Sequence, residues 1–415
     1  MKVAIVGAGP AGAVAAKTLA RGGADVTLFD GSHPREKPCG GGVTGRALAL
    51  VGDALAGRGV PGVPITAAVF ADTGGTHDRE RTARVALDAQ GFSKASSLVV
   101  VSRAVFDRAL LDAALEAGAR LVPSRVTAVD VQPDGVDVRT RDASHRADVV
   151  IGADGANSLV RRTVAQAFTR AELSIATGYY AHGVSSSVID IRFSSRPAGY
   201  LWSFPRPDHL AIGICAQADA SQPEPLKEAC RAWMDEARLA PGAELTPYSW
   251  PIPSLGPAAI QREQPAGRGW LLAGDAAGLV DPITREGIFF ALQSGLYAAE
   301  SLIESPSAYA PAYTARLRAD IYPELAHAAR LKAGFFRGRF TRLLIEALHR
   351  SAPVRAIMAD LVGGRQANRG LRRRLLRTFE LGLAWQLLRL YWQREDTVEA
   401  SADVLASSGG SSDWR

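Results

Sequence analysis

The sequence predicts an α/β protein in which a parallel sheet flanked by helices is interleaved with an antiparallel sheet and followed by a helical region. Three observations predict this class. The first thirty residues have the pattern of a strand, a glycine turn, a helix and a second strand. Apolar residues alternate with period two in later stretches such as 187–193 and 209–216, as in half-buried strands. From Tyr309 onward the chain is mostly helical in character.

The bulk composition is that of a globular protein with two domains or one elaborated domain. The chain has 415 residues, of which 47% are hydrophobic and 22% are charged. No run approaches the roughly twenty apolar residues that cross a bilayer, and the first strand begins directly after Met1, so we expect no secretory signal. Cys39, Cys215 and Cys230 are the only cysteines, which predicts no disulfide framework and a cytoplasmic location. We predict no metal site.

The N-terminal strand, turn and helix carry a Rossmann-like dinucleotide-binding pattern. Gly7, Gly9 and Gly12 follow the buried strand at the required spacing. Gly7 permits the tight turn, Gly9 lets backbone N–H groups approach a pyrophosphate, and Gly12 lets the helix pack close to the strand. Asp30 ends the second strand, where it can accept hydrogen bonds from a ribose diol. An adenine dinucleotide is therefore predicted. The alternative is a glycine-rich structural turn, because the string alone also occurs at residues 40–45.

Two later segments favour a flavin over a nicotinamide. In residues 147–158 an apolar strand meets the glycine-flanked Asp154 and then the start of a helix. In residues 269–287, Asp275 follows a strand and is placed to accept hydrogen bonds from a polyhydroxylated ribityl chain. The helix that begins near Gly287 directs its N-terminus at a ring that becomes anionic on reduction.

In this order and at these separations, the three segments resemble the flavoprotein monooxygenase superfamily, whose fold resembles para-hydroxybenzoate hydroxylase. The resemblance covers residue 1 to about residue 305 and implies FAD as the cofactor. It implies that Ala11 and Gly12 contact the pyrophosphate, that Asp30 contacts the adenosine ribose and that Asp275 contacts the ribityl chain. The further cofactor contacts that it implies are Arg103, Val126 on the adenine side, and Gly287 and Ile288 beside the pyrimidine side of the ring. For Arg103 the alternative is a helix-capping or solvated arginine.

Residues 197–205 place an aromatic residue at every second position. Tyr200, Trp202 and Phe204 share one face of a strand and form a flat apolar wall. Such a wall suits a long isoprenoid chain, which makes dispersion contacts and almost no hydrogen bonds. Spacing alone favours the alternative, an amphipathic strand that buries its apolar face in the core.

With its prolines, this string matches the P-x-x-Y-x-W-x-F-P signature of geranylgeranyl reductases at every fixed position. The turn at residues 37–43 resembles that family's cysteine-glycine loop, which implies flavin contacts at Cys39, Gly40 and Gly42. Residues 360–376 are similar to the family's C-terminal helices, so the resemblance extends to about residue 392. One departure is Arg285, where the family commonly has glycine. A side chain there narrows the space near the ring or contacts an anionic head group.

The resemblance implies an FAD-dependent reductase that saturates carbon–carbon double bonds of a prenyl chain by hydride transfer from reduced flavin. The faces of Trp202 and Tyr200 can stabilise developing positive charge, by roughly 1–2 kcal/mol when desolvated. Tyr200, Cys39 and a water on residues 286–287 are the candidate proton donors, and a structural role is the alternative for Cys39. The rival functions are an aromatic hydroxylase or monooxygenase on the same fold, a flavin-dependent halogenase, and a non-catalytic lipid-binding or flavin-storage protein.

The expected partners are a prenyl lipid or prenylated small molecule and an electron donor. NAD(P)H, a deazaflavin or ferredoxin would dock transiently, because only one glycine motif lies in a strand–turn–helix. Residues 330–394 hold fifteen Lys or Arg against three acids, although the whole chain has a net charge of +6. This basic segment also carries apolar side chains, which is compatible with peripheral docking on the inner face of a membrane. The alternative is a solvated helical face; a nucleic-acid partner is not expected.

The predicted domains interleave along the chain. They are an FAD-binding domain (1–64, 98–162 and 264–305), a substrate-binding β-sheet domain (65–97 and 163–263), a C-terminal helical region (306–405) and a disordered tail (406–415).

Overall fold

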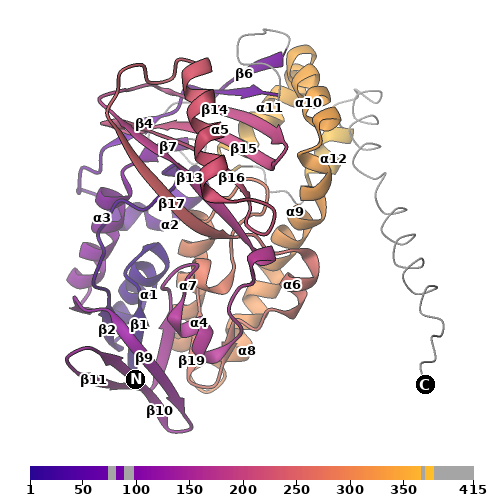
Figure 1. The fold of residues 1–415 in the computed structure, drawn as a ribbon. Helices are drawn as coiled ribbons and strands as arrows, with labels where there is room; N and C mark the ends of the chain where they lie inside the picture. The colour runs from indigo at the N-terminus through magenta and orange to yellow at the C-terminus, as the bar shows by residue number, and fades with distance from the viewer. Residues whose placement is uncertain (73–80, 88–97, 366–369, 378–415) are drawn as a thin grey trace, which may run out of the picture.

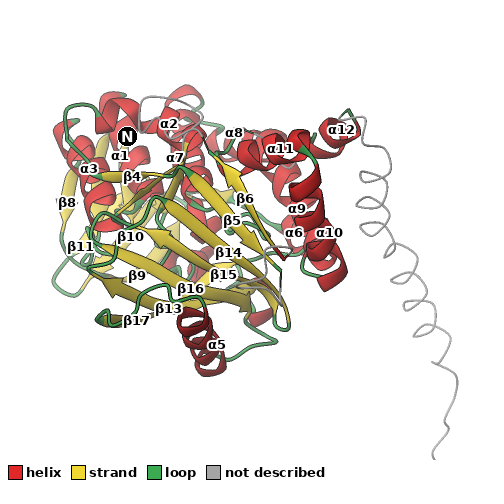
Figure 2. Ribbon diagram, turned by 90° about the horizontal axis from the view of Figure 1, so that it is seen from above, coloured by secondary structure: helices red, strands yellow, loops and turns green. Residues whose placement is uncertain are grey.

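The computed structural model describes residues 1–72, 81–87, 98–365 and 370–377. Two large sheets dominate the fold. The six-stranded sheet lies in the lower half of Figure 1, the seven-stranded sheet lies in the upper half, and helices α9 to α12 lie to the right of the seven-stranded sheet. Figure 2 shows the strands of the seven-stranded sheet from above, with α5 outside that sheet. The mixed parallel and antiparallel architecture confirms the predicted fold class.

The six-stranded sheet brings the three predicted cofactor segments to one edge. Its order is β18-β19-β12-β1-β2-β8, and all its pairs are parallel except β18 with β19. Val6 at the end of β1 is paired with Gly152 and Phe29, and Gly152 is paired with Leu272. The segments that follow these strands therefore meet at the carboxyl edge. The strands are β1 Lys2–Val6, β2 Asp25–Phe29, β8 Arg120–Val122, β12 Val149–Gly152, β18 Ala266–Gly267 and β19 Trp270–Leu272.

The seven-stranded sheet has the order β17-β13-β16-β15-β14-β5-β6 and is antiparallel except where β14 pairs with β5. The strands predicted from alternation are β14 and β16, and the aromatic string is β15. Their bounds are β5 Ala67–Ala71, β6 Thr82–Ala86, β13 Leu173–His182, β14 Val188–Ser195, β15 Ala198–Pro205, β16 His209–Gln217 and β17 Leu245–Pro253.

Two small sheets complete the strand structure. One has the order β3-β7-β4 and the other has the order β11-β10-β9. Their strands are β3 Gly42–Thr44, β4 Gly62–Pro64, β7 Leu98–Val101, β9 Val126–Gln132, β10 Gly135–Thr140 and β11 Ser144–Ala147.

Helices cover both sheets, and the region from Tyr309 is helical as predicted, as far as the described residues extend. The first group is α1 Pro10–Arg21, α2 Gly45–Leu55, α3 Arg103–Glu116, α4 Leu159–Val164, α5 Pro223–Glu236 and α6 Pro257–Arg262. The second group is α7 Ile288–Glu304, α8 Tyr309–Arg316, α9 Tyr322–Phe335, α10 Gly338–Arg350, α11 Ala352–Val362 and α12 Leu371–Leu376. The part of the predicted membrane-docking segment beyond residue 377, and the predicted disordered tail at 406–415, lie outside the described residues.

Close packing of α1 against α7 sets the position of the site. A Cβ atom on Gly295 would lie 2.2 Å from the carbonyl oxygen of Ala11, and a Cβ on Gly12 would lie 1.9 Å from the carbonyl oxygen of Gly7. Only glycine allows either approach. The N-termini of α1 and α7 therefore both lie near the carboxyl edge of the six-stranded sheet.

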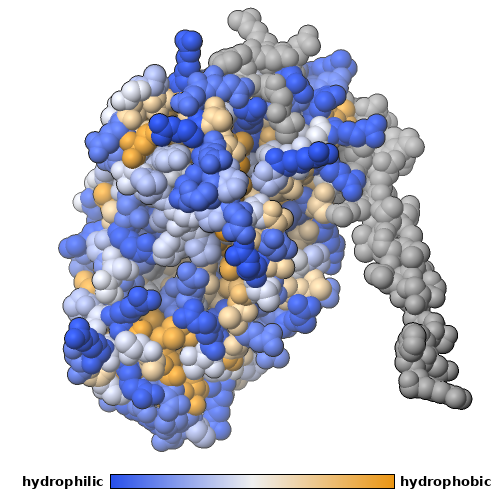
Figure 3. Space-filling model, in the orientation of Figure 1, coloured by the Kyte–Doolittle hydropathy of each residue, from blue (hydrophilic) through white to orange (hydrophobic). Residues whose placement is uncertain are grey.

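The face of the molecule seen in Figure 3 is mostly hydrophilic, with hydrophobic residues in separate areas. Within the part of the chain that the structure describes, every helix is too short or too polar to cross a membrane.

Candidate active site

The glycine turn after β1 has the geometry that a pyrophosphate requires. Gly7 has a φ of +103°, and a Cβ there would lie 2.3 Å from the carbonyl oxygen of Ala153. Gly9 is extended at the N-cap of α1, Pro10 occupies the first turn, and among the described side chains none caps this helix. Its first N–H groups are thus free to bind an anion, aided by the helix dipole. The cradle fits the phosphates of FAD.

Asp30 lies at the end of β2 and already has several donors. Its Oδ2 accepts from the backbone N–H of Ala8 at 2.8 Å and contacts His33 Nδ1 at 2.7 Å. Its Oδ1 accepts from the backbone N–H groups of Ser32 and His33 at 2.7 and 2.8 Å. Burial raises the pKa of Asp30, but the bonds from His33 and Ala8 outweigh burial and hold that pKa well below its usual value. The carboxylate thus organises its own turn, and the ribose contact stays a prediction.

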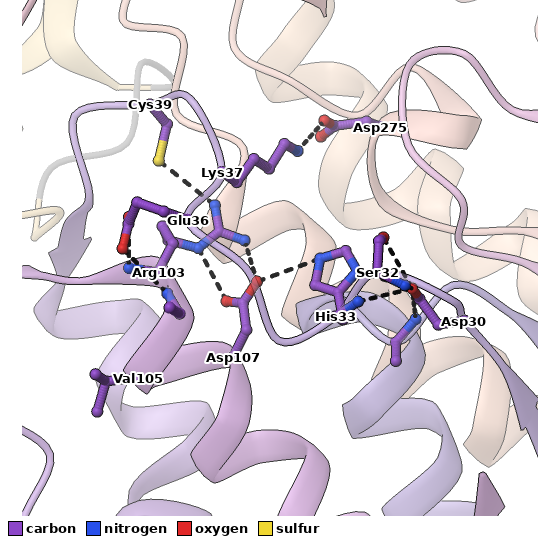
Figure 4. A network of polar contacts seen from close by, with 12 residues as sticks. Asp30, Ser32, His33, Glu36, Lys37, Cys39, Arg103, Val105, Asp107 and Asp275 are labelled. Atoms are coloured by element: carbon purple, nitrogen blue, oxygen red, sulfur yellow. Dashed lines mark hydrogen bonds and ion pairs between the residues drawn. The ribbon is translucent and has the colours of Figure 1, made fainter. Parts of the chain in front are cut away.

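Arg103, the first residue of α3, is buried within a polar network that Figure 4 shows. Its Nε and Nη2 donate to the Asp107 carboxylate at 2.9 and 2.8 Å, and Nη1 lies 3.5 Å from Cys39 Sγ. Burial lowers the pKa of Arg103, but the neighbouring Asp107 and Cys39 outweigh burial and hold that pKa above its usual value. Asp107 also lies 3.6 Å from His33 Nε2. Arg103 is therefore neither solvated nor a cap, and Ser102 is the N-cap residue instead.

Two residues that the sequence analysis missed hold the cysteine loop. Arg206, fully buried just after β15, pairs with Glu36 and donates to the carbonyl oxygen of Cys39. Burial lowers the pKa of Arg206 to about 10. Glu36 also accepts from Ser102 Oγ at 2.7 Å and from the backbone N–H of Arg103 at 3.0 Å. The position of Arg206 directly after the aromatic-proline string was the available signal.

The cysteine loop lies against the aromatic strand. Cys39 is a half-buried free thiol. A Cβ on Gly40 would lie 2.2 Å from Cδ2 of Phe204, so the glycine lets the loop and the ring touch. The loop and the seven-stranded sheet thus meet at this point.

Asp275 follows β19, and its Oδ2 forms a 2.7 Å ion pair with Lys37 Nζ from the cysteine loop. A Cβ on Gly287, the N-cap of α7, would lie 3.4 Å from Asp275 Oδ1. The predicted ribityl acid and the start of α7 are therefore neighbours. Lys37 was not predicted here, and it provides a cation beside the position expected for the cofactor's polar chain.

One cavity of about 450 Å³ joins these groups to the sheet and to the C-terminal helices. Tyr200, Trp202 and Phe204 all line it, as do Arg103 and Asp275. Its far part is formed by apolar side chains of α9 to α12, including Leu331, Phe335, Phe340, Leu344, Ile357 and Leu375. The aromatic strand therefore faces a cavity and is not simply buried in the core.

The hydroxyl of Tyr200 donates to the carbonyl oxygen of Thr284 at 2.7 Å. Burial, and next the neighbouring Cys215, raise the pKa of Tyr200 well above its usual value. Trp202 is 4% exposed, and its Nε1 has no partner among the described residues. Tyr200 thus offers its ring, rather than an easily released proton, to the cavity.

The structure brings most of the predicted residues together. The cavity is lined by Cys39, Gly40, Gly42, Arg103, Asp275, Gly287, Ile288 and the three aromatic residues. Gly7, Gly9, Ala11 and Gly12 lie at the N-terminus of α1, where the adjoining Pro10 reaches the cavity. Val126 is buried at the start of β9 and does not line the cavity. The segment just before Val126 approaches Gly31, next to Asp30.

This fold and its glycine cradle define a flavoprotein of the FAD-dependent oxidoreductase class, and the FAD binding domain family matches residues 1–312. FAD is the cofactor of this class. The chain belongs to the geranylgeranyl reductase family of these enzymes.

Relatives agree with this assignment, and solved structures share the fold. A digeranylgeranylglycerophospholipid reductase 2 of Methanopyrus kandleri is 30% identical over 73% of this chain and 77% of its own length. The chloroplastic geranylgeranyl diphosphate reductase of Nicotiana tabacum is 29% identical over 73% of this chain and 66% of its own. A geranylgeranyl bacteriochlorophyll reductase-like structure from Thermoplasma acidophilum has a TM-score of 0.74 at 21% identity, covering 91% of this chain and 99% of that one. The flavin-dependent brominase Bmp2 has the same fold, with a TM-score of 0.67, 20% identity, and coverage of 91% and 99%.

Proposed function

We propose that this enzyme saturates isolated carbon–carbon double bonds of a prenyl chain. The observation that carries the proposal is the continuous cavity from the cysteine loop and Asp275 to the apolar side chains of α9 to α12. Its lining suits a long hydrocarbon, since apolar and aromatic side chains form most of its wall. The names of the relatives, which refer to geranylgeranyl substrates, support the same class of substrate.

FAD, when bound and reduced, supplies a hydride for one alkene carbon. An isolated alkene has no carbonyl to accept charge, so the protein lowers the barrier by positioning the chain and by stabilising developing positive charge. Trp202 and Tyr200 line the cavity, and in this proposal their rings provide that stabilisation.

The second alkene carbon must receive a proton. We favour Cys39 as the donor because the Tyr200 hydroxyl already donates a hydrogen bond to the carbonyl oxygen of Thr284 and has a raised pKa. Cys39 lines the cavity, and Arg103 lies 3.5 Å from its sulfur, where a positive charge would stabilise the thiolate left after transfer. The thiol then regains its proton from solvent.

The proposal also assigns the cofactor contacts, the domain division and the electron donor. The cofactor contacts are those predicted at Gly7, Gly9, Ala11, Gly12 and the residues that line the cavity. The entry of β5 and β6 into the seven-stranded sheet supports the proposed division into an FAD-binding domain and a substrate-binding sheet domain. The electron donor in this proposal is NAD(P)H, a deazaflavin or ferredoxin.

The test is anaerobic photoreduction of the FAD-loaded protein, followed by addition of geranylgeranyl diphosphate. The expected result is flavin reoxidation with a mass gain of about two daltons for each bond that is reduced. Binding of the lipid without reoxidation would indicate a lipid-binding protein instead. Rapid NAD(P)H oxidation in air with hydrogen peroxide or a hydroxylated product would indicate a hydroxylase.

Peripheral docking on a membrane is a separate proposal. It rests on the basic and apolar residues of the segment 330–394, of which the structure describes only part. Flotation with anionic and with neutral liposomes tests it, and equal absence of binding to both would refute it.

A further inference from the structure

Arg285 occupies a backbone conformation that does not suit its residue type. Its φ is +61°, in the left-handed region where glycine is at home. Among the described non-glycine residues, only Arg238, with a φ of 48°, shares this sign. The geranylgeranyl reductase pattern commonly has glycine at this position. A residue in this conformation persists only where its surroundings hold it in place, so the contacts of its side chain are the next question.

The side chain of Arg285 meets a second cation. Its Nη1 donates to Ser254 Oγ at 2.6 Å, and Nζ of Lys332 donates to the same oxygen at 2.7 Å. Lys332 also donates to Gln217, and Arg285 to the carbonyl oxygen of Pro282. Two positive groups therefore converge on one neutral hydroxyl. Within the described parts of the chain, no carboxylate lies within ion-pair distance of either.

Both cations are only partly satisfied. Nε and Nη2 of Arg285 are buried and have no hydrogen-bond partner among the described residues. Burial, and next the charge of Arg285, lower the pKa of Lys332 to about 7. Buried donors and charges without partners are costly, and a bound anion removes both costs. Arg285 lines the cavity, so such an anion can arrive with the substrate.

We propose that Arg285 and Lys332 form a phosphate-binding site at the side of the prenyl cavity, which takes the phosphate or diphosphate group of the substrate. The identity of the chain attached to that phosphate rests on the proposed function. A guanidinium and an ammonium together match a dianionic phosphate better than a singly charged carboxylate, and the planar guanidinium suits two phosphate oxygens at once. The site would select phosphorylated prenyl substrates over neutral ones such as prenyl alcohols or quinones.

The test measures binding to the FAD-loaded, oxidised protein, so that turnover is not required. The ligands are geranylgeranyl diphosphate, geranylgeraniol, a digeranylgeranylglyceryl phosphate and inorganic diphosphate. The variants are Arg285→Gly, which suits the backbone, and Lys332→Met. Arg238→Gly is the matched control, because it removes an arginine from the other left-handed position of a non-glycine residue.

We expect the native protein to bind geranylgeranyl diphosphate at least tenfold more tightly than geranylgeraniol. Arg285→Gly should lose at least tenfold for the diphosphate and less than twofold for the alcohol, whereas Arg238→Gly should change neither. Tighter binding of the glyceryl phosphate than of geranylgeranyl diphosphate would identify a lipid head group as the natural source of the phosphate. Competition by inorganic diphosphate supports the site. Equal losses for both prenyl ligands, or none, would overturn it.

The two proposals can fail separately. If the phosphate preference depends on Arg285 but reduced flavin is never reoxidised, only the alkene-reducing function fails. If geranylgeraniol and its diphosphate are reduced alike, and Arg285→Gly leaves their ratio unchanged, only the phosphate site fails.

Discussion

The buried ion pair between Arg103 and Asp107 gives a quantitative test of how the cysteine loop is held. The two side chains are 3% and 0% exposed and share two hydrogen bonds. Replacement of Arg103 by Met leaves a buried carboxylate without its main partner, which typically costs about 3–5 kcal/mol of unfolding free energy. Because Arg103 also contacts Cys39, we expect weaker FAD retention in this variant.

The same helix supplies a control. Arg108 and Asp112 form an ion pair with the same spacing, but their side chains are 60% and 35% exposed. Such exposed pairs contribute about 0.3–0.5 kcal/mol, so Arg108→Met should be nearly neutral. Urea unfolding at a fixed excess of FAD, followed by circular dichroism, measures both variants. Equal losses for Arg103→Met and Arg108→Met would refute the reasoning.

A double variant separates the charge from the packing. Arg103→Met combined with Asp107→Leu removes both charges from the interior, and such replacements are often neutral or stabilising. We therefore expect it to regain most of the stability that Arg103→Met loses. If the double variant also fails to retain FAD, the Arg103 contact with Cys39, rather than stability, is what FAD retention requires.

Three further predictions concern the cradle, the cavity and the proposed phosphate site. Gly12→Ala should abolish FAD binding, because its Cβ would lie 1.9 Å from a backbone carbonyl oxygen. Gly52→Ala is the control: its Cβ would meet open space, so this variant should retain FAD. The flavin absorbance of the purified protein measures both. Ile357→Trp places a large side chain in the apolar part of the cavity, so it should remove the affinity advantage of a C20 over a C15 prenyl diphosphate. That advantage is up to ~4 kcal/mol, at ~0.8 kcal/mol per buried carbon. Ala356→Trp, on the exposed side of α11, should preserve the advantage in the same titration. The affinity for diphosphate should fall as the pH rises through about 7, because Lys332 then loses its proton. The groups that face this lysine are Arg285, Cys215 and Asp219. Above that pH range, the native protein and Lys332→Met should bind diphosphate equally well.

The sequence predicted those parts of the site that depend on local pattern. The glycine turn, the acid after β2 and the alternating aromatic residues are each set by neighbours in the chain, so periodicity and steric rules were enough. The convergence of Arg206 and Glu36 on Cys39 was not predictable in this way, because it joins residues from different elements. Nor does any local pattern indicate that the Tyr200 hydroxyl donates a hydrogen bond to the carbonyl oxygen of Thr284, more than eighty residues away.

For Arg285, part of the site could be predicted from the sequence and part could be seen only in the folded chain. Its departure from glycine was visible in the sequence, and contact with an anionic head group was one of two expectations. The sequence did not indicate Lys332 as its neighbour, because α9 brings that lysine to Ser254 only in the folded chain. The positive φ of Arg285 is likewise a property of the backbone alone.

The order of strands along the chain constrains how a substrate can reach the flavin. Along the chain, the polypeptide crosses between the two large sheets four times: between β2 and β5, between β6 and β8, between β12 and β13, and between β17 and β18. One sheet can swing away from the other only if all four connecting segments change conformation together. In proteins whose domains are joined by a single linker, only that linker has to change. The topology therefore fixes the distance between the aromatic strand β15 and the predicted flavin position. Under the proposed function, a prenyl chain would therefore bind without a swing of one sheet away from the other, and its successive double bonds would be presented by sliding the chain along the cavity.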